Sequence, residues 1–443
     1  MSNTLAKKFD LFSLIKFALP NTIMMVFLSM YVIVDGIFIS RFVGTTALSA
    51  VNMVFPALSI ILAVAIMIAT GGSAIIARRM GEGKEQEART NLSFLVLVEI
   101  CFGILVMIFG NLFLDQIVTL LGASAAQFEM CRVYARIIFL FAPCFALQTG
   151  FETFFVTAGK PTIGLSVVVV AGITNIVLDY VFIVPLQMGI LGAALGTGIG
   201  TCIPALSGIL FFLRKGGKTL YFVKPEFDGR VLLKTCANGS SEMVTNLSNA
   251  VTTFLFNYTF MKFFGENGVA SITIILYFQY IFTALYFGYS NGIAPVISFK
   301  YGQGDTGQLK QVFKNSVWIV SCGSVLAFIF SRILSGLVIK VFTPEQSPVY
   351  QLTLGGISVF SIGFLLMGIS IFASALFTAL SDGFSSAVIS FARTFVFLVG
   401  AILLLPNLLG ENGVWLSVPA AEACGIIVTF LFLVWKRKKY QYC

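Results

Sequence analysis

Long apolar runs recur along the entire chain and limit what it can fold into. A run of about 18 residues with few charges is long enough to cross a lipid bilayer as a helix. Such runs occur at about residues 11–39, 47–77, 92–120, 133–158, 162–184, 189–213, 236–262, 269–299, 314–341, 350–379, 384–406 and 412–435. Hydrophobic residues make up 58% of the 443 positions, and charged residues only 11%. The sequence therefore predicts an all-α membrane protein with twelve transmembrane helices.

The chain also carries an internal repeat. A shift of 221 positions aligns, without a gap, Gly44 with Gly265, Gly71 with Gly292, Gly81 with Gly302, Gly83 with Gly304, Pro185 with Pro406, Gly189 with Gly410 and Gly192 with Gly413. One shift that serves both ends of a half is hard to obtain by chance. Because each half holds six spans, both halves enter the membrane from the same side, which gives parallel repeats of a kind found in transporters. We expect two pseudo-symmetric six-helix bundles.

The longest polar connection divides the chain between these halves. It is basic and contains several glycines and a proline, which is typical of a linker. The expected units are an N-terminal bundle at 1–213, a cytoplasmic linker at 214–235, a C-terminal bundle at 236–435 and a cytoplasmic tail at 436–443.

Lysine and arginine predict the orientation, because they are enriched in cytoplasmic loops. With the N-terminus inside, the basic residues of 77–90, of the linker, of 300–314 and of 436–439 all lie in the cytoplasm. The basic loop residues left outside are then Arg41, Arg132, Arg136, Lys262, Arg332 and Lys340. We therefore expect a multi-pass protein of the cell membrane with both termini in the cytoplasm. The net charge of +9 is explained by this topology, and no nucleic-acid partner is expected.

Several classes of chemistry lack the residues that they need. The chain has no histidine, which removes histidine triads, histidine metal sites and histidine proton relays. Its eight cysteines form no CxxC pair and are interpreted as small core residues. The GxG turns at 81–83 and 302–304 lack a preceding strand and the longer Walker pattern, so ATP-driven pumping is not expected. The first span is expected to be retained, because a signal-peptide cleavage site is lacking.

A polar cluster interrupts the apolar stretch at 172–200. Asn175 and Asp179 are four residues apart and so share one face of a helix, while Thr197 lies near the start of the next helix. Asp35, late in the first span, is expected at a similar depth in the outer half of the membrane. Two nearby carboxylates in a low dielectric share a proton or hold a cation, and amide and hydroxyl oxygens suit a hard cation. The sequence thus predicts a site for Na⁺ or H⁺.

A purely structural role for these residues stays open. An intramembrane aspartate can cap a neighbouring helix, and Asn175 and Thr197 alone would be typical of polar bridges between helices. The positions 221 residues after the four cluster residues are Phe256, Val396, Gly400 and Val418. Because these carry no comparable ligands, the acidic site is expected in the N-terminal half only.

Other polar residues and prolines in the spans have weaker implications. Arg393 and Glu422, near mid-depth on neighbouring spans, could form an intramembrane ion pair with a structural role. Pro20 could permit a functional bend in the first span, or cause a kink without function. A last group of carboxylates is placed nearer the cytoplasmic ends, where they could reach water, and their roles stay open: Glu99, Glu152 and Glu242.

Several stretches resemble, in order and spacing, the MATE (multidrug and toxic compound extrusion) family of transporters. They are ALPNTIMMVFLSMYVIVDGIFISRFVGTTALSA, ARRMGEGKEQEA, LLGASAAQFEMCRVYARI, TAGKPTIGLSVVVVAGITNIVLDYVFI, GILGAALGT and LLLPNLLGENGVWLSVPAAEA. The resemblance covers essentially the whole chain. It implies two six-helix bundles in a V, a central cavity, alternating access, and export of organic cations in exchange for Na⁺ or H⁺.

The resemblance also implies roles for single residues. Members with a cation site in the N-terminal bundle have it at positions that match Asp35, Asn175, Asp179 and Thr197. Pro20 matches the proline at which the first helix bends. A second branch has an acidic and tyrosine site in the C-terminal bundle. The span at 350–379 has no carboxylate, so no such site is expected here.

We therefore expect a secondary active multidrug efflux transporter rather than an enzyme. It should act as a monomer in the lipid bilayer on organic, amphipathic cations, with Na⁺ or H⁺ as coupling ion and no cofactor. A lipid-linked or oligosaccharide flippase of the same superfamily is the alternative, although the first bundle lacks a cationic lining. An intramembrane aspartyl protease with Asp35 and Asp179 as its dyad is more distant, because 176–179 reads IVLD in place of GxGD.

Overall fold

The computed structural model describes residues 4–124 and 127–443, and neither range contains a strand. The first half contains η1 (Thr4–Ala6), α1 (Leu11–Phe38), the π-helical η2 (Ile39–Val43), α2 (Thr45–Gly81), α3 (Glu85–Leu112), α4 (Leu114–Leu120), α5 (Phe128–Leu140), α6 (Ala142–Thr157), α7 (Pro161–Ile183) and α8 (Gly189–Leu213). The second half contains α9 (Gly229–Gln303), α10 (Thr306–Phe342), α11 (Pro348–Phe360), α12 (Ile362–Ala379), α13 (Gly383–Phe391), the π-helical η3 (Ala392–Phe397), α14 (Leu398–Leu409) and α15 (Glu411–Tyr440). The predicted all-α class is confirmed.

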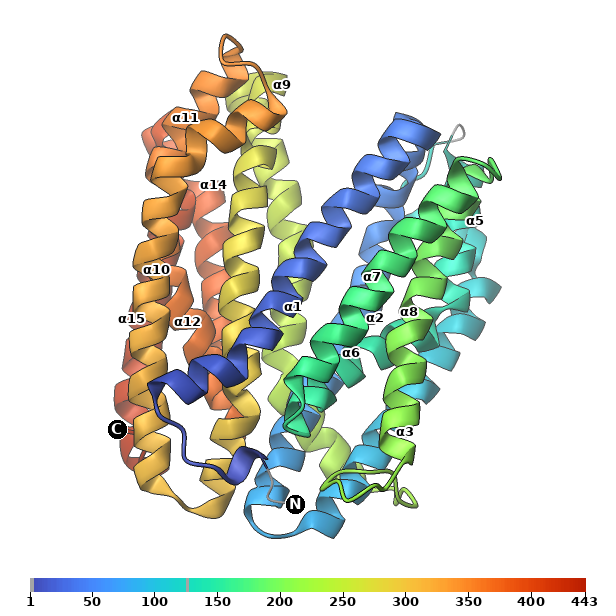
Figure 1. Cartoon of the computed structure of the whole chain (residues 1–443). Coiled ribbons are helices and arrows are strands. Elements are labelled where there is room, and N and C mark those ends of the chain that lie inside the picture. Colours follow the sequence, from blue (N-terminus) through green and yellow to red (C-terminus); the bar gives the residue numbers. More distant parts are fainter. Residues whose placement is uncertain (1–3, 125–126) are drawn as a thin grey trace.

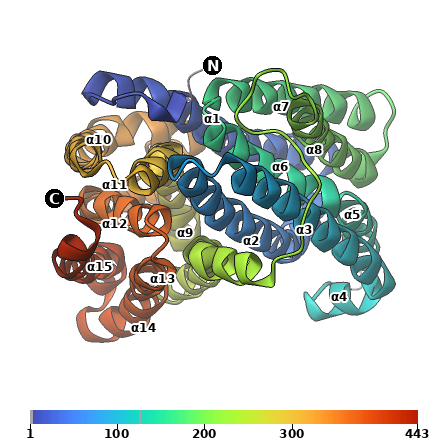
Figure 2. The same cartoon turned by 90° about the horizontal axis from the view of Figure 1, so that it is seen from below.

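The helices form two groups. Figure 1 shows α2–α8 on one side and α10–α15 on the other, and the view along the helices in Figure 2 shows the same division. The two groups of ribbons approach each other at the lower end of Figure 1 and diverge toward the upper end. Helix α9 connects the groups, because both α1 and α2 pack extensively against it.

The number of spans depends on how broken helices are counted. Ten helices of the described chain are long and apolar enough to cross a membrane, or eleven if α5 and α6, which meet at 54°, form one span. Helix α9 is counted once here, although it has 75 residues and non-helical backbone at Gly265. At about 1.5 Å per residue it is more than twice as long as a bilayer is thick. Counting a span on each side of Gly265 gives the predicted twelve.

The repeat in the sequence recurs in the backbone. Gly83 and Gly304 have φ angles of 76° and 72°, and Gly189 and Gly410 have φ angles of 58° and 60°. Each pair is separated by the same 221 positions, and glycine adopts these positive φ angles at little cost. Turns between helices therefore come at equivalent places in the two halves.

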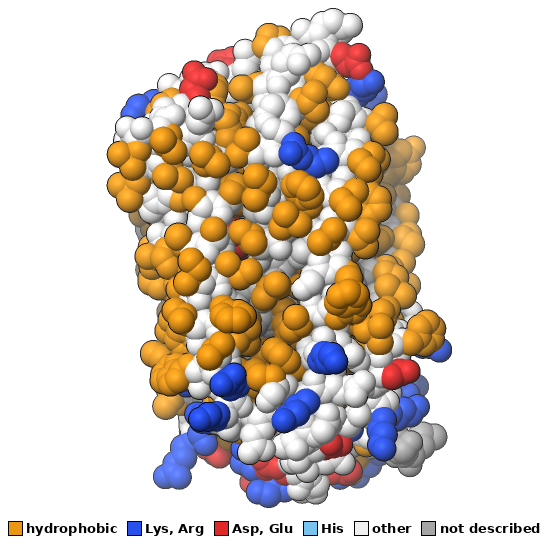
Figure 3. All heavy atoms as spheres, turned by 90° about the vertical axis from the view of Figure 1, so that its left-hand side faces the viewer, with side chains coloured by type: hydrophobic (Ala, Val, Ile, Leu, Met, Phe, Trp, Pro, Cys, Tyr) orange, Lys and Arg blue, Asp and Glu red, His pale blue; other side chains and the backbone are white. Residues whose placement is uncertain are grey.

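Hydrophobic side chains form a broad band across the middle of one face of the molecule. On the face in Figure 3, hydrophobic side chains cover the middle, and most lysines and arginines gather at the lower end. A band of this kind suits contact with lipid. The lower end, which carries residues 78–84, 214–228 and 436–439, is called the basic end below.

Helices α2 and α9 touch backbone to backbone at the basic end. A Cβ atom added to Gly81 would overlap the carbonyl oxygen of Phe299, and one added to Gly302 would overlap the carbonyl oxygen of Arg78. The two contacts are reciprocal, because Phe299 follows Arg78 by 221 positions. Small residues permit such close approach of helices. The two halves thus meet here in a pseudo-two-fold contact.

The second half has more helix than expected at both of its ends. Helix α9 begins at Gly229 rather than at 236, and α15 continues through most of the expected tail, to Tyr440. Asp382, in the turn before α13, holds this end of α15. Its carboxylate pairs with the Lys436 ammonium at 3.0 Å and accepts a hydrogen bond from the Tyr440 hydroxyl at 2.8 Å. Burial by itself would raise the pKa of Asp382, but the hydrogen bonds have the larger combined effect in the opposite direction. The pKa of Asp382 therefore lies below its ordinary value.

Replacing Asp382 by asparagine should destabilise the protein, because the amide cannot pair with the charge of Lys436. We expect the free energy of unfolding to fall by about 1–3 kcal/mol, as for other hydrogen bonds to charged groups. Since the folded pKa is depressed, this stabilisation is complete above about pH 4 and disappears as the pH falls through the folded pKa. Thermal unfolding of both proteins between about pH 3 and pH 7 measures the difference.

Asp228→Asn is the matched control. Asp228 caps α9 by accepting hydrogen bonds from the backbone N–H groups of Arg230 and Val231, and it is exposed. Asparagine caps a helix about as well as aspartate does, so this variant should keep its stability. Equal stability of the Asp382→Asn and Asp228→Asn proteins at pH 7 would contradict the role of Asp382.

Candidate functional site

The four residues of the predicted cation site come together between α1, α7 and α8. Asn175 and Asp179 lie one turn apart on α7, and both are 1% exposed. The Asn175 amide Nδ2 donates a hydrogen bond of 3.5 Å to the Thr197 hydroxyl of α8. The carboxyl group of Asp35, from α1, is close enough to that of Asp179 to share a hydrogen bond. Whether this cluster binds the coupling ion stays a prediction.

Glycines on α8 create the space for these side chains. A Cβ atom added to Gly196 would overlap the Oδ1 atom of Asp179, and one added to Gly200 would lie 3.1 Å from the Cβ of Asn175. The two glycines are four residues apart, so they form one stripe that faces α7. Small residues at this spacing let two membrane helices approach closely. The glycine-rich sequence of α8 therefore positions the polar face of α7.

Three oxygen atoms of the cluster are available to a ligand. The Oδ1 atoms of Asp35, Asn175 and Asp179 are buried, and none has a hydrogen-bond partner among residues 4–124 and 127–443. Buried polar atoms normally have partners, because an unpaired one is costly. Two carboxyl groups this close in a low dielectric hold a proton between them or take up a cation. The arrangement can therefore bind H⁺ or a small hard cation.

A cation at this site would depend on more than carboxylates. No group of three or more Cys, Asp or Glu side chains that could hold a metal ion occurs in the part of the chain that the structure describes. Oxygen ligands beyond the two carboxylates would come from the Asn175 amide and the Thr197 hydroxyl. Such mixed oxygen sets suit a monovalent cation rather than a tightly held divalent one.

Two tyrosines beside the cluster were missed by the sequence analysis. Tyr31 lies within hydrogen-bonding reach of Thr197, and the negative charges of Asp35 and Asp179 act on both Tyr31 and Tyr134. Tyr31 is four residues before Asp35, so the shared helix face was a signal that could have found it. Tyr134 comes from α5, and no spacing in the sequence connects it to the other residues.

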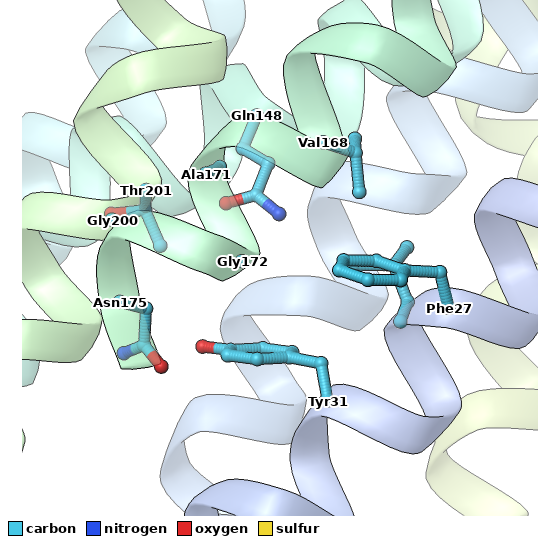
Figure 4. A pocket seen from close by; sticks show the side chains of 10 residues that line it. Phe27, Tyr31, Gln148, Val168, Ala171, Gly172, Asn175, Gly200 and Thr201 are labelled. Atoms are coloured by element: carbon cyan, nitrogen blue, oxygen red, sulfur yellow. The ribbon is translucent and has the colours of Figure 1, made fainter. Parts of the chain in front are cut away.

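A small pocket opens beside the cluster. It is lined by Phe27, Leu28, Tyr31, Gln148, Val168, Ala171, Gly172, Asn175, Gly200 and Thr201. The pocket offers a volume of about 20 Å³ to the centre of a water molecule. This is room for about one water molecule. Figure 4 shows the hydroxyl of Tyr31 and the amide of Asn175 pointing toward each other at one side of this space. The pocket therefore has the size and the polar groups for water or a small ion.

The other predicted residues lie apart from this cluster. Pro20 is inside α1, and its role in bending stays a prediction. Arg393 and Glu422 are in contact in the second half, where the Arg393 Nε lies 2.9 and 2.8 Å from the two carboxylate oxygens of Glu422. The predicted ion pair is thus present, although it plays no part in the N-terminal cluster.

The expectation that Glu99, Glu152 and Glu242 reach water was wrong. Their exposed fractions are 0%, 8% and 2%. Glu152 accepts a hydrogen bond of 2.9 Å from Gln148, which lines the pocket. Neither carboxyl oxygen of Glu99 has a hydrogen-bond partner among the described residues. The position of a residue along a helix predicts its depth in the membrane, but not which helix packs beside it. Here packing against neighbouring helices shields the three glutamates from water.

The chain is similar to known transporters over almost its full length. It is 25% identical to the multidrug export protein MepA of Staphylococcus haemolyticus over 423 residues, which are 95% of this chain and 92% of that protein. It superposes on a structure of MATE in complex with MaL6 with a TM-score of 0.91 and 21% identity, covering 99% of this chain and 98% of the other. An outward-facing multidrug resistance MATE family transporter of the MOP superfamily gives a TM-score of 0.90 with 23% identity, over 99% and 97%.

A family model also matches the chain, once in each half. The model is described as MatE, and it matches residues 20–181 and 242–403. The two matches begin and end at nearly equivalent places of the repeat. Together they cover well over half of the 443 residues, and the chain therefore belongs to the MatE family.

Proposed function

We propose that this protein exports organic, amphipathic cations across the cell membrane in exchange for Na⁺ or H⁺. One observation carries the proposal: within the described part of the chain, Asp35 and Asp179 meet inside the membrane region with unpaired Oδ1 atoms and without a basic side chain to neutralise them. An acidic pair in such surroundings has to take up positive charge from outside. The family and the relatives that are multidrug export proteins support an exporter.

The exchange follows from competition for this negative charge. In the outward-facing form the aspartates take up the coupling ion, and the bound organic cation leaves. In the inward-facing form they release the ion and attract the next organic cation. A one-for-one exchange of monovalent cations moves no net charge, so the concentration gradient of the coupling ion drives the export. Each additional coupling ion that crosses a potential of 100 mV would add about 2.3 kcal/mol. In this proposal the basic end faces the cytoplasm, and a monomer is sufficient.

The carboxylates can be tested by neutralising each of them. Asp35→Asn and Asp179→Asn should each reduce gradient-driven efflux of a fluorescent organic cation from proteoliposomes about tenfold or more, since losing about 1.4 kcal/mol of coupling already costs a factor of ten. Sodium and proton gradients imposed separately identify the coupling ion. Asp115→Asn is the control, because Asp115 is exposed and pairs with Arg132 at the surface.

Two results would contradict the proposal. Full efflux in both variants would leave Asp35 and Asp179 with a structural role only. Failure of the wild type to move any organic cation, together with movement of a fluorescent lipid-linked saccharide, would favour the flippase alternative.

The close packing of α8 on α7 gives a second test. Gly196→Ala should impair efflux about as much as Asp179→Asn does, because the added methyl group would occupy the position of the Asp179 carboxylate. Gly323→Ala is the control, since a Cβ atom at Gly323 of α10 would meet no atom within 4 Å. Efflux rates and thermal unfolding of both variants separate loss of function from loss of folding. Equal efflux by the two variants would show that the contact between Gly196 and Asp179 is unimportant.

A further inference from the structure

The Arg393–Glu422 ion pair lies where the repeat places the counterpart of the N-terminal pocket. Gly172 and Thr201 both line that pocket. At the separation of 221 positions, Gly172 corresponds to Arg393 and Thr201 corresponds to Glu422. In the second half, a basic residue therefore stands where the pocket has Gly172, and an acidic residue stands where it has Thr201.

The correspondence does not depend on the choice of register. Helix α7 begins at Pro161 and α13 begins at Gly383, which is a separation of 222. By that register Arg393 corresponds to Ala171, which also lines the pocket.

The ion pair is well built and shielded from solvent. Both carboxylate oxygens of Glu422 lie within 2.9 Å of the Arg393 Nε, and the two side chains are only 10% and 7% exposed. A Cβ atom on Gly425 of α15 would lie 3.3 Å from the Arg393 Cγ, so α15 packs closely over this side chain. Beside the pair, the Thr394 hydroxyl donates a hydrogen bond of 3.2 Å to Ser248 of α9. These contacts join η3, α15 and α9.

A second carboxyl group is buried within range of the charge of the same arginine. Glu242 of α9 is 2% exposed, and the positive charge of Arg393 acts on it. Its Oε2 atom is buried and has no hydrogen-bond partner among residues 4–124 and 127–443. The charge of Glu422 also acts on Tyr286. In the second half Glu422 therefore has a basic partner, whereas Asp35 and Asp179 have none among the described residues.

We propose that the C-terminal half contains a cation site that the protein fills itself, with the Arg393 guanidinium held by Glu422. The tethered guanidinium belongs to the counterpart of the pocket beside the N-terminal cluster. Once emptied, the site should accept a small guanidinium compound or a monovalent metal cation. Only the N-terminal half then exchanges its cation, so one coupling site operates per chain. This last consequence rests on the proposed function, whereas the binding site itself does not.

Removing the tethered cation should create a binding site that can be refilled. The wild type, Arg393→Ala and the double variant Arg393→Ala, Glu422→Gln are compared by thermal unfolding with added methylguanidinium chloride. Breaking a buried ion pair leaves an uncompensated charge, so Arg393→Ala should unfold at a lower temperature. Methylguanidinium at about ten times its dissociation constant should raise the unfolding temperature of this variant by about 2 °C or more. Tetramethylammonium chloride at the same concentration controls for ionic strength and for size.

Of the wild type, Arg393→Ala and the double variant, only Arg393→Ala should recover. The same response in the wild type, or in the double variant that lacks the Glu422 charge, would overturn the proposal. Arg393→Gln is the second variant, because its amide keeps polar contact with Glu422 while removing the charge. Absence of recovery in both single variants, including failure of both to fold in the presence of methylguanidinium, would also overturn it. Because the measurement is made on purified protein without a gradient, its failure is distinct from failure of the transport assay.

Discussion

A carboxylate inside the hydrocarbon layer has to be neutralised, because neither lipid nor apolar side chains solvate its charge. The two halves of this protein meet that constraint differently. In the second half, Glu422 is paired with Arg393 at 2.8 Å, and this cation cannot leave. In the first half, Asp35 and Asp179 have each other, an amide and two tyrosines, but no basic side chain among the described residues. We propose this difference between the halves as the physical basis of coupled exchange.

Close approach of helices makes possible both the polar cluster and the contact between the two halves at the basic end. Gly196 and Gly200 let α8 lie against the polar face of α7, so that Asp179 and Asn175 are buried without being displaced. Gly81 and Gly302 likewise let α2 and α9 approach so closely that their backbones are in contact. In a membrane, where apolar side chains gain little from leaving lipid, such close packing is a main source of helix association. The high glycine content of the chain is thus part of its architecture.

Much of this architecture could be predicted from the chain alone. Apolar length predicts spans, and a constant separation of 221 positions predicts equivalent halves, which the φ angles of Gly189 and Gly410 reproduce. The cluster of Asn175 and Asp179 could be predicted because a four-residue spacing is a local property of a helix. Tyr134 could not, because it reaches the cluster from α5 through packing of separate helices. The burial of Glu99 was missed for the same reason.

The sequence by itself determined the helical class, the repeat, and which residues carry charge into the membrane. These follow from local periodicity and from the cost of unpaired polar groups in lipid. The tertiary structure alone decided which of those charges meet. Arg393 pairs with Glu422, and Asp35 lies beside Asp179, although the members of these pairs are 29 and 144 positions apart in the chain. Such pairings depend on how the helices are rotated and packed against each other. A local sequence pattern does not predict this arrangement.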